Sequence, residues 1–309
     1  MESWKKDLER KSMTLLSDKI PCRITIFSEF DIIKKSLEFY TKYSDRLLIT
    51  VIENRSDNTE GLIKPYVLDL LKQGKICKYI LFDKNISSNA SVMVFRQNLF
   101  EMTNSPYVIA TEGDLICEDE HWLDEEISIL EQNPEVFVVG MDMSLENLPK
   151  VKNAENWVPP AIPVEDKNYQ LGNTGGWCLL YRKDDYKKIF KHIVIQKNSV
   201  PIDSEQGKYC NNMGKIWTRT KKAKVYHLTW DIYKNPEHPY TKMKRKMGFS
   251  KIWLQKKYCG YRIYQKDDKG VVFEKKVRII PFIYRIMTQL TRLFYVIRRL
   301  RIIWKVKAC

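Results

Sequence analysis

Several sequence signatures of common enzyme classes are missing from this chain. It has no Walker-type phosphate loop, no Gly-x-Gly-x-x-Gly dinucleotide fingerprint, no His-Glu-x-x-His zinc motif and no nucleophile-elbow sequence. We also find no internal repeat and no low-complexity segment. The sequence therefore gives little support to P-loop enzymes or to hydrolases.

Long apolar runs and ordered cysteine pairs are missing as well. No stretch of about 18 uncharged apolar residues occurs, so we expect no ordinary membrane-spanning helix. Residues 1–7 lead into polar sequence, which does not predict a signal peptide. The seven cysteines are odd in number and none has the spacing of a zinc ribbon or a redox pair. We therefore expect reduced thiols in a cytosolic protein.

Charge is distributed unevenly along the 309 residues. Residues 1–230 carry 32 Lys and Arg against 33 Asp and Glu, whereas residues 231–309 carry 21 basic and 5 acidic residues. The net charge of +15 thus comes from the C-terminal part. The first part is typical of an ordinary globular domain, and the last part predicts a polyanion or a membrane surface as its partner.

Short apolar runs alternate with amphipathic stretches in the first part of the chain. The apolar runs are typical of buried strands and cover residues 24–28, 47–52, 76–82, 107–111 and 136–141. The stretches between them have helical spacing and cover residues 31–43, 62–73, 88–103 and 121–132. This alternation predicts βαβ units, and hence an α/β fold with a mostly parallel sheet flanked by helices.

The pattern changes after residue 142. Residues 142–170 contain four prolines and predict a loop region. The elements expected beyond it are a strand over 177–181, helices over 183–192 and 203–213, and one or two strands over 216–227.

Acidic residues follow three of the predicted strands. Glu53 ends the second strand, Asp83 follows the third, and Glu112-Gly113-Asp114 follows the fourth. Ligands of open α/β sheets bind beyond the carboxyl ends of the strands. The coincidence of acids and strand ends predicts a functional site there.

The Glu112-Gly113-Asp114 triplet suits a divalent cation. Carboxylate oxygens are the ligands that Mg²⁺ and Mn²⁺ prefer, and these ions bridge protein carboxylates to substrate phosphates. A glycine between the acids would let a diphosphate approach the backbone closely. The alternative for the bare triplet is a solvated turn.

Three other candidates have a structural alternative beside the functional one. Glu53 is placed to bind a nucleobase or ribose, or it belongs to a turn that caps a helix. Asp203 and Glu205 offer a general base, or they complement the dipole at a helix N-terminus. His227, at the end of a β-like run, is either a metal ligand or a structural residue.

Taken in order, these segments resemble the family 2 glycosyltransferases of the GT-A fold, over about residues 22–230. Residues 24–28 resemble the opening strand, residues 52–59 resemble the family's acidic stretch, and Glu112-Gly113-Asp114 resembles the Asp-x-Asp metal motif. Asp203, with Gly214 eleven residues later, matches the spacing of the family's Glu-Asp-x-Asp…Gly segment.

Two further matches complete the resemblance. Asn85 with Arg96 and Asn98 is similar to the family's Asn-x-Gly…Arg-Asn segment, and His227 falls where many members place a further metal ligand. The chain departs from the family in having Glu112 as the first metal acid and Ile202 where an acid is common. It also has Ser28-Glu29-Phe30-Asp31 after the first strand, and these departures indicate a divergent member.

The resemblance implies inverting transfer of a sugar from a nucleotide-diphosphate sugar to a hydroxyl acceptor. Asp203 would be the catalytic base, and Mn²⁺ or Mg²⁺ would be held by Asp114 with Glu112 and His227. The residues expected to bind the donor are Ser28, Glu29, Glu53, Asn85, Arg96, Glu112 and Gly113. Those expected to shape the side of a glycan or lipid-linked acceptor are Gly175, Gly176, Trp177 and Glu205. For Trp177, stacking on a sugar ring and a plain core position are both open.

The C-terminal stretch 275–309 contains ten basic residues and no acidic residue, with apolar residues between them. Four arginines recur every seven residues and stay near one helical face; they are Arg278, Arg285, Arg292 and Arg299. This predicts an amphipathic helix, with Pro281 in its first turn, lying on an anionic membrane surface. The alternative is a helix docked on the catalytic domain or on a partner.

We therefore expect two parts. Residues 1–230 would form the catalytic domain, and residues 231–309 a basic aromatic linker followed by the membrane-associating helix. The expected location is the cytoplasm, at the inner face of the membrane.

Two other function classes compete with this interpretation. The basic C-terminal segment, with its interleaved aromatics, also fits a nucleic-acid-binding protein, although no recognised nucleic-acid motif is present and we expect no nucleic-acid partner. Acidic metal sites on α/β sheets also occur in nucleotidyltransferases, which release pyrophosphate rather than a nucleoside diphosphate.

Overall fold

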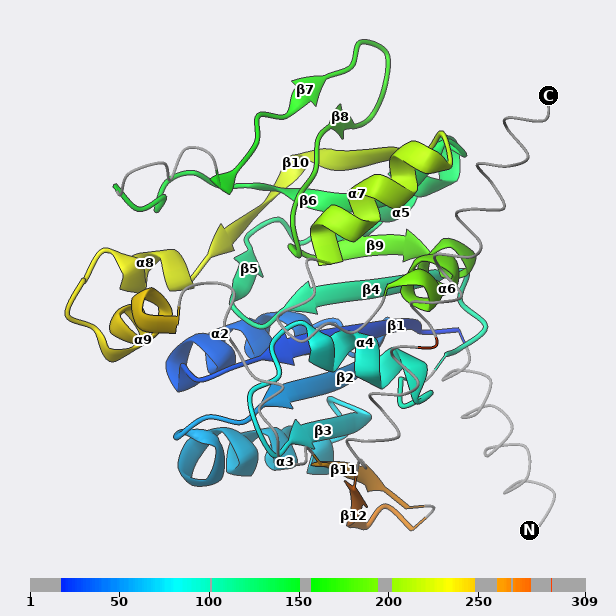
Figure 1. The fold of residues 1–309 in the computed structure, drawn as a ribbon. Helices are drawn as coiled ribbons and strands as arrows, with labels where there is room; N and C mark the ends of the chain where they lie inside the picture. The colour runs from blue at the N-terminus through cyan, green and yellow to red at the C-terminus, as the bar shows by residue number, and fades with distance from the viewer. Residues whose placement is uncertain are drawn as a thin grey trace, which may run out of the picture.

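The computed structural model describes residues 18–100, 102–150, 157–193, 202–247, 260–267, 269–278 and Leu290. A single twelve-stranded sheet runs through this part of the chain, with helices on both of its faces (Figure 1). The predicted α/β class with flanking helices is confirmed.

The centre of the sheet is parallel. Its strands are β1 (Ile20–Ile26), β2 (Leu47–Asn54), β3 (Lys78–Phe82) and β4 (Tyr107–Glu112), arranged in the order β3-β2-β1-β4. In this register Ile24 lies beside Val51 of β2 and Thr111 of β4. These strands carry apolar side chains on both faces, because helices cover the sheet on both sides.

Beyond β4 the sheet becomes mixed. β9 (Leu179–Arg182) is antiparallel to both β4 and β6 (Val136–Met143), and β6 is parallel to β10 (Ile216–His227). β10 also pairs with the short strands β5 (Leu115–Cys117) and β8 (Gln170–Leu171), and β8 pairs with β7 (Ile162–Pro163). Of the described residues in the predicted loop region 142–170, the first two end β6, Ile162 and Pro163 form β7, and Gln170 begins β8.

The helices form two layers, each over its own apolar core. One layer consists of α2 (Phe30–Thr41), α3 (Lys64–Lys72) after the π-helix η1 (Thr59–Ile63), and α5 (Trp122–Gln132). The other consists of α4 (Asn89–Arg96), α6 (Lys183–His192) and α7 (Ile202–Asn212). The helix expected over 88–103 ends at Arg96, because Asn98 adopts a left-handed backbone with φ 52°.

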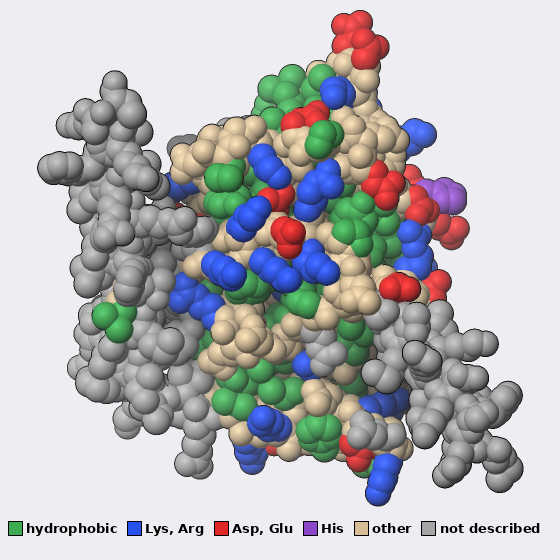
Figure 2. Space-filling model, turned by 90° about the vertical axis from the view of Figure 1, so that its right-hand side faces the viewer, with side chains coloured by type: hydrophobic (Ala, Val, Ile, Leu, Met, Phe, Trp, Pro, Cys, Tyr) green, Lys and Arg blue, Asp and Glu red, His purple; other side chains and the backbone are tan. Residues whose placement is uncertain are grey.

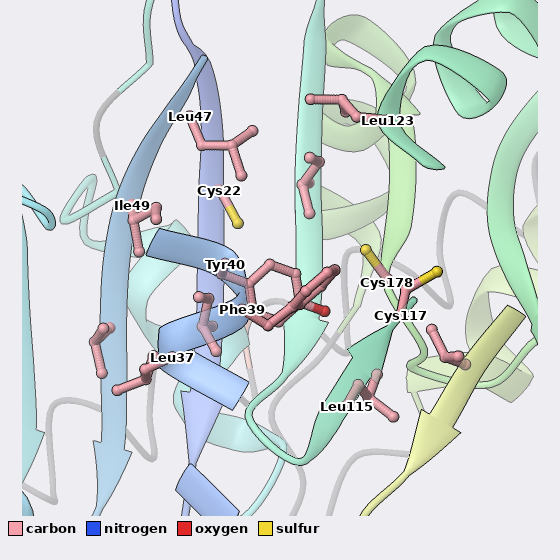
Figure 3. Close-up of a cluster of buried hydrophobic side chains, with 14 of the residues drawn as sticks. Cys22, Leu37, Phe39, Tyr40, Leu47, Ile49, Leu115, Cys117, Leu123 and Cys178 are labelled. Carbon is pink, nitrogen blue, oxygen red and sulfur yellow. The ribbon is translucent and has the colours of Figure 1, made fainter. Parts of the chain in front are cut away.

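The core on the α2 side contains three of the cysteines. Figure 3 shows Cys22, Cys117 and Cys178 near Tyr40, among leucine and isoleucine side chains. Together with Cys77 and Cys210, these thiols are free, so no disulfide joins the described cysteines. This agrees with the expectation of reduced thiols.

The sheet extends past residue 230. β11 (Gly260–Lys266) is antiparallel to β3, and β12 (Val272–Arg278) is antiparallel to β11, so both belong to the same sheet as β1. The boundary expected at residue 230 is therefore not a break in the sheet. Along the chain, α8 (Thr229–Tyr233) and α9 (Pro239–Met247) lie between β10 and β11.

The predicted C-terminal helix lies largely outside the described residues. Its first part, residues 275–278, is strand rather than helix, because it continues the ladder between β12 and β11. Of residues 279–309 only Leu290 is described. Within the described chain, no helix has the length and apolarity needed to cross a bilayer.

The two ends of the parallel strands differ in character. In Figure 1 the arrowhead of β4 points to the side that carries β5, α8 and α9. Figure 2 shows the opposite side of the molecule, where Lys and Arg side chains gather in the middle of the face among fewer acidic ones. The strand-end carboxylates described next therefore lie away from this basic face.

Candidate functional site

Three potential metal ligands meet at the carboxyl end of β4. Glu112 is its last residue, Asp114 lies in the turn to β5, and His227 ends β10. The antiparallel pairing of β5 with β10 sets His227 beside Leu115, one residue after Asp114. One ligand atom from each of the three residues lies within 4.8 Å of the others. We call these residues the Glu-Asp-His trio.

Packing against β1 requires a glycine at position 113. A Cβ atom at this position would lie 2.3 Å from Cγ2 of Ile26 on β1. The Gly113 amide donates a hydrogen bond to the carbonyl of Thr25 at 2.8 Å. The contact with β1 is therefore one reason for a glycine at this position, and room for a diphosphate stays a prediction.

Asp114 is held from one side only. Its Oδ2 accepts a hydrogen bond from Thr229 Oγ1 at 2.9 Å, and its carbonyl accepts one from the Leu228 amide at 2.8 Å. Its Oδ1 is buried and has no hydrogen-bond partner among the described residues. Burying a carboxylate oxygen without a hydrogen-bond partner costs free energy of folding unless a cation or a water molecule binds to that oxygen. The trio therefore fits a divalent cation.

His227 is fixed by its neighbours. Its ring stacks on Trp230, with centroids 4.9 Å apart and planes 4° from parallel. Its Nδ1 lies 2.8 Å from Thr229 Oγ1, and its carbonyl accepts a hydrogen bond from Asn147 Nδ2 at 2.8 Å. The side chain is thus positioned before any ligand binds.

The loop before β9 lies against Glu112. A Cβ at Gly176 would be 3.1 Å from Glu112 Oε1, and the Gly175 amide donates to Asn173 Oδ1 at 2.8 Å. Trp177 meets Trp230 edge-on at 6.5 Å. The structure therefore brings Gly175, Gly176 and Trp177 to the trio.

β10 anchors this loop through two side chains that the sequence did not indicate. Trp217 Nε1 donates to Thr174 Oγ1 at 3.2 Å. Arg219, only 1% exposed, donates to the carbonyls of Asn173 and Pro159 and pairs with Asp142 at 3.3 Å. β10 thus positions both the loop and His227.

A group of aromatic side chains borders the trio, and we call it the tryptophan cluster. Its members are Trp157, Trp177, Trp230 and Tyr233. Trp157 lies 6.5 Å from Trp230 and 6.1 Å from Tyr233, and it is 36% exposed. Burial, followed by the charge of Asp114, raises the pKa of Tyr233 to about 12. The cluster and the trio are in direct contact, because Trp230 of the cluster stacks on His227 of the trio.

Asp203 lies in the first turn of α7. The helix ends just before β10 starts, and Ile216 at that start pairs with Val136 at the start of β6. The first turn of α7 therefore points toward the opposite edge, where β4 and β6 end. Burial raises the pKa of Asp203 to about 6, and the described residues give it no hydrogen bond or ion pair. Glu205, by contrast, pairs with Lys208 at 2.9 Å.

The residues expected to bind the donor differ in where they lie and in how deeply they are buried. Ser28, with φ 73°, follows β1; its Oγ donates to Glu29 Oε1 at 3.2 Å, and Asn85 Oδ1 accepts from the Ser87 amide at 2.8 Å. Both lie after the carboxyl ends of central strands. Glu53 is fully buried, and its two oxygens accept hydrogen bonds from the hydroxyls of Thr59 and Tyr79.

Arg96 is not brought to the trio. It ends α4, which follows the carboxyl end of β3 and runs back along the sheet. Its guanidinium donates to the carbonyl of Ile193 at 2.6 Å. An eight-residue helix is about 12 Å long, so Arg96 lies near the other end of the strands. The structure thus gives Glu53 and Arg96 partners within the chain, and their contacts with a donor stay a prediction.

Comparison with known proteins gives relatives without a described function. Three uncharacterised proteins of Acanthamoeba polyphaga mimivirus are 40%, 42% and 39% identical over 281, 253 and 257 residues. These matches cover 85%, 80% and 81% of this chain, but only 38%, 51% and 28% of the relatives. The chain thus spans about half or less of the length of the relatives it matches. No protein-family model matches it.

Among solved structures, the chain is similar to mannosyl-3-phosphoglycerate synthase from Rubrobacter xylanophilus. The similarity covers 84% of this chain and 87% of that one, with a TM-score of 0.37 and 11% sequence identity.

Proposed function

We propose that this chain is a metal-dependent glycosyltransferase that moves a sugar from a nucleoside-diphosphate sugar to a hydroxyl acceptor. The observation that carries the proposal is the buried, unpartnered Oδ1 of Asp114 within the Glu-Asp-His trio, at the carboxyl end of a central strand. Ligands of α/β sheets bind at this edge. A divalent cation there would neutralise the charge that develops on a departing diphosphate.

The donor set of the trio favours Mn²⁺ over Mg²⁺. Mg²⁺ binds through oxygen ligands and keeps several waters, whereas imidazole is a ligand of softer divalent ions. Two carboxylates and one imidazole therefore suit Mn²⁺, which accepts both. Glu112, Asp114 and His227 would hold the ion.

The two sides of the trio suit two substrates. On one side the turns after β1 and β3 offer Ser28 and Asn85 to the donor nucleotide. On the other side lie the loop 172–177 and the tryptophan cluster, and partly exposed aromatic rings offer flat apolar surface to an acceptor sugar. A glycan, or a glycan carried by a lipid, is the acceptor we propose.

Asp203 is the proposed catalytic base. Its carboxylate would take the proton of the acceptor hydroxyl as that oxygen bonds to the anomeric carbon. The bond from this carbon to the diphosphate oxygen breaks in the same step, so the nucleoside diphosphate leaves and the configuration inverts. A carboxylate whose pKa is raised toward neutrality is a better base than an exposed one.

A donor screen tests the proposal. Nucleoside-diphosphate sugars are incubated with oligosaccharide acceptors, with and without Mn²⁺, and released nucleoside diphosphate is measured. We expect release with Mn²⁺ that falls by at least about 100-fold in Asp114→Asn, as for loss of a charge-stabilising group. Asp69→Asn, on the exposed side of α3, is the matched control and should keep full activity. Release of pyrophosphate instead would identify a nucleotidyltransferase.

The basic segment 275–309 supports a second part of the proposal, association with an anionic membrane. Each basic residue near such a surface contributes on the order of 1 kcal/mol, so ten provide reversible binding. The full chain should sediment with anionic vesicles at low salt and stay in solution with neutral ones. Sedimentation with neither, together with salt-dependent nucleic-acid binding, would favour the nucleic-acid alternative.

A further inference from the structure

Thr229 lies between two members of the Glu-Asp-His trio. It is the first residue of α8 and is 3% exposed. Its Oγ1 lies 2.9 Å from Asp114 Oδ2 and 2.8 Å from His227 Nδ1. Both distances are those of good hydrogen bonds. The backbone also ties this segment to the acid, because the Leu228 amide donates to the Asp114 carbonyl.

Counting protons assigns the direction of both bonds. A hydroxyl has one proton to donate, and a carboxylate oxygen only accepts, so the Thr229 proton goes to Asp114 Oδ2. Thr229 Oγ1 must then accept the second bond, which requires a proton on Nδ1 of His227. The direct separation of His227 Nδ1 from Asp114 Oδ2 is 3.6 Å, too long to be a hydrogen bond itself.

The ring nitrogen that can bind a metal follows from this assignment. A neutral imidazole with its proton on Nδ1 has its lone pair on Nε2. Stacking on Trp230 holds the ring in plane. At Asp114, the hydroxyl of Thr229 donates its hydrogen bond to Oδ2. The buried Oδ1 is then the oxygen that has no partner among the described residues.

We propose that Thr229 is a positioning residue of the metal centre. Its hydroxyl fixes His227 as the tautomer that presents Nε2, and it orients Asp114 so that Oδ1 faces the cation. The inference rests on the proposed function for the presence of the metal, but the tautomer of His227 does not depend on it. Outer hydrogen bonds of this kind typically change metal affinity by 10–100-fold.

The test uses Thr229→Val and Thr229→Ser in the full chain. Valine has nearly the shape of threonine but no hydroxyl, whereas serine keeps the hydroxyl. Mn²⁺ affinity is measured by titration with electron paramagnetic resonance, since bound Mn²⁺ loses the signal of the free ion. We expect Thr229→Val to weaken binding by about 10–100-fold, and Thr229→Ser to stay within about threefold of the parent.

A second measurement needs neither metal nor activity. Long-range ¹H–¹⁵N spectra of the metal-free chain distinguish the two histidine tautomers. We expect His227 to carry its proton on Nδ1 in the parent and in Thr229→Ser, and to lose this preference in Thr229→Val. A purely structural role for Thr229 would lower the unfolding temperature without changing the tautomer.

The outcomes separate the inference from the proposed function. In one outcome, the parent binds no Mn²⁺ while His227 carries its proton on Nδ1. That result would reject the proposed metal site and would support the role of Thr229 in fixing the tautomer of His227. If the parent binds Mn²⁺ and Thr229→Val binds it equally well, the inference is overturned. If Thr229→Val does not fold, the parent spectrum decides: an Nε2-protonated His227 overturns the inference, and an Nδ1-protonated one supports it.

Discussion

Asp203 is the residue whose environment bears most directly on catalysis. Burial raises its pKa from an ordinary 3.8 to about 6. A general base works only when it is deprotonated, so we expect kcat/KM to rise with pH through about 6 and to level off above it. In Asp203→Asn we expect a loss of about 10²–10⁴-fold, and no inflection near pH 6.

Initial rates of nucleoside-diphosphate release across this pH range test both expectations. Donor binding, measured separately by calorimetry, should be unchanged in Asp203→Asn. An inflection that persists in the variant would assign the titration to another group.

Glu126 is a second buried acid, and it has no role in the proposed reaction. It lies on α5 and is fully buried, and in the described part of the chain neither of its carboxylate oxygens has a hydrogen-bond partner. Burial, followed by the charge of Glu125, raises its pKa well above the ordinary value. The folded chain therefore binds this proton more tightly than the unfolded chain, so its contribution to stability is lost as pH rises above about 4.3.

We expect Glu126→Gln to stabilise the chain at about pH 8, because glutamine has no charge to bury, and each unit by which burial raises the pKa of Glu126 corresponds to about 1.4 kcal/mol. The gain should shrink toward pH 5, which is closer to the pKa of an unfolded glutamate. Urea unfolding at the two pH values measures the difference. An equal effect at both would contradict a protonated Glu126 in the folded chain.

The trio shows which site residues a sequence can and cannot reveal. Glu112 and Asp114 were found because acids at strand ends are locally visible, and His227 because it ends a β-like run. Thr229 was missed, because its role arises only when the β5–β10 pairing sets Asp114 beside it. The hydrogen bonds of Glu53 with Thr59 and Tyr79 could not be predicted either, because Tyr79 lies on a neighbouring strand that only the folded sheet brings beside Glu53.

At the scale of elements, Gly113 links the trio to β1. A Cβ there would lie 2.3 Å from Cγ2 of Ile26 and 3.2 Å from the Thr25 carbonyl. We expect Gly113→Ala to destabilise the chain by about 1–3 kcal/mol, because the neighbouring strand cannot yield. Gly207, within α7, has open space around its Cβ position and is the matched control. There alanine should stabilise by about 0.5–1 kcal/mol.

Thermal unfolding measures both effects: we expect the unfolding temperature to fall in Gly113→Ala and to rise in Gly207→Ala. An unchanged unfolding temperature in Gly113→Ala would contradict this expectation, because it would mean that β1 and β4 can move apart to make room for the added methyl group.

Elements were predictable where they carry a complete local pattern. The strands β2, β3, β4 and β6 consist mostly of apolar residues between polar turns, so composition alone marks them. β1 is predicted over 24–28 but spans Ile20–Ile26, because Pro21 and Arg23 interrupt its apolar pattern. β5, β7 and β8 have two or three residues each, too few for a pattern. The last four residues of β12, 275–278, fall within the amphipathic helix predicted over 275–309. They form a strand because β12 pairs with β11, which in turn pairs with the distant strand β3.

At the scale of the whole molecule, β11 completes the sheet. Tyr261 packs on Phe82 with ring centroids 5.5 Å apart, and Tyr264 stacks on Tyr79 at 5.3 Å. Both tyrosines and Ile263 are buried. Removing β11 would expose the edge of β3, together with its backbone hydrogen-bonding groups.

We therefore expect a chain truncated after residue 247 to lose most of its stability, and a chain truncated after residue 278 to keep it. Burial of a large apolar side chain contributes about 1.5–3 kcal/mol, so three such residues amount to much of the 5–15 kcal/mol typical of a domain. Unfolding temperature and Mn²⁺ binding of the two truncated chains, compared with the full chain, measure this. The chain ending at 278 also lacks most of the basic segment, so it should retain Mn²⁺ binding while losing sedimentation with anionic vesicles. If the chain ending at 247 unfolds at the temperature of the full chain, β11 is an accessory to the sheet, and the boundary expected at residue 230 would stand.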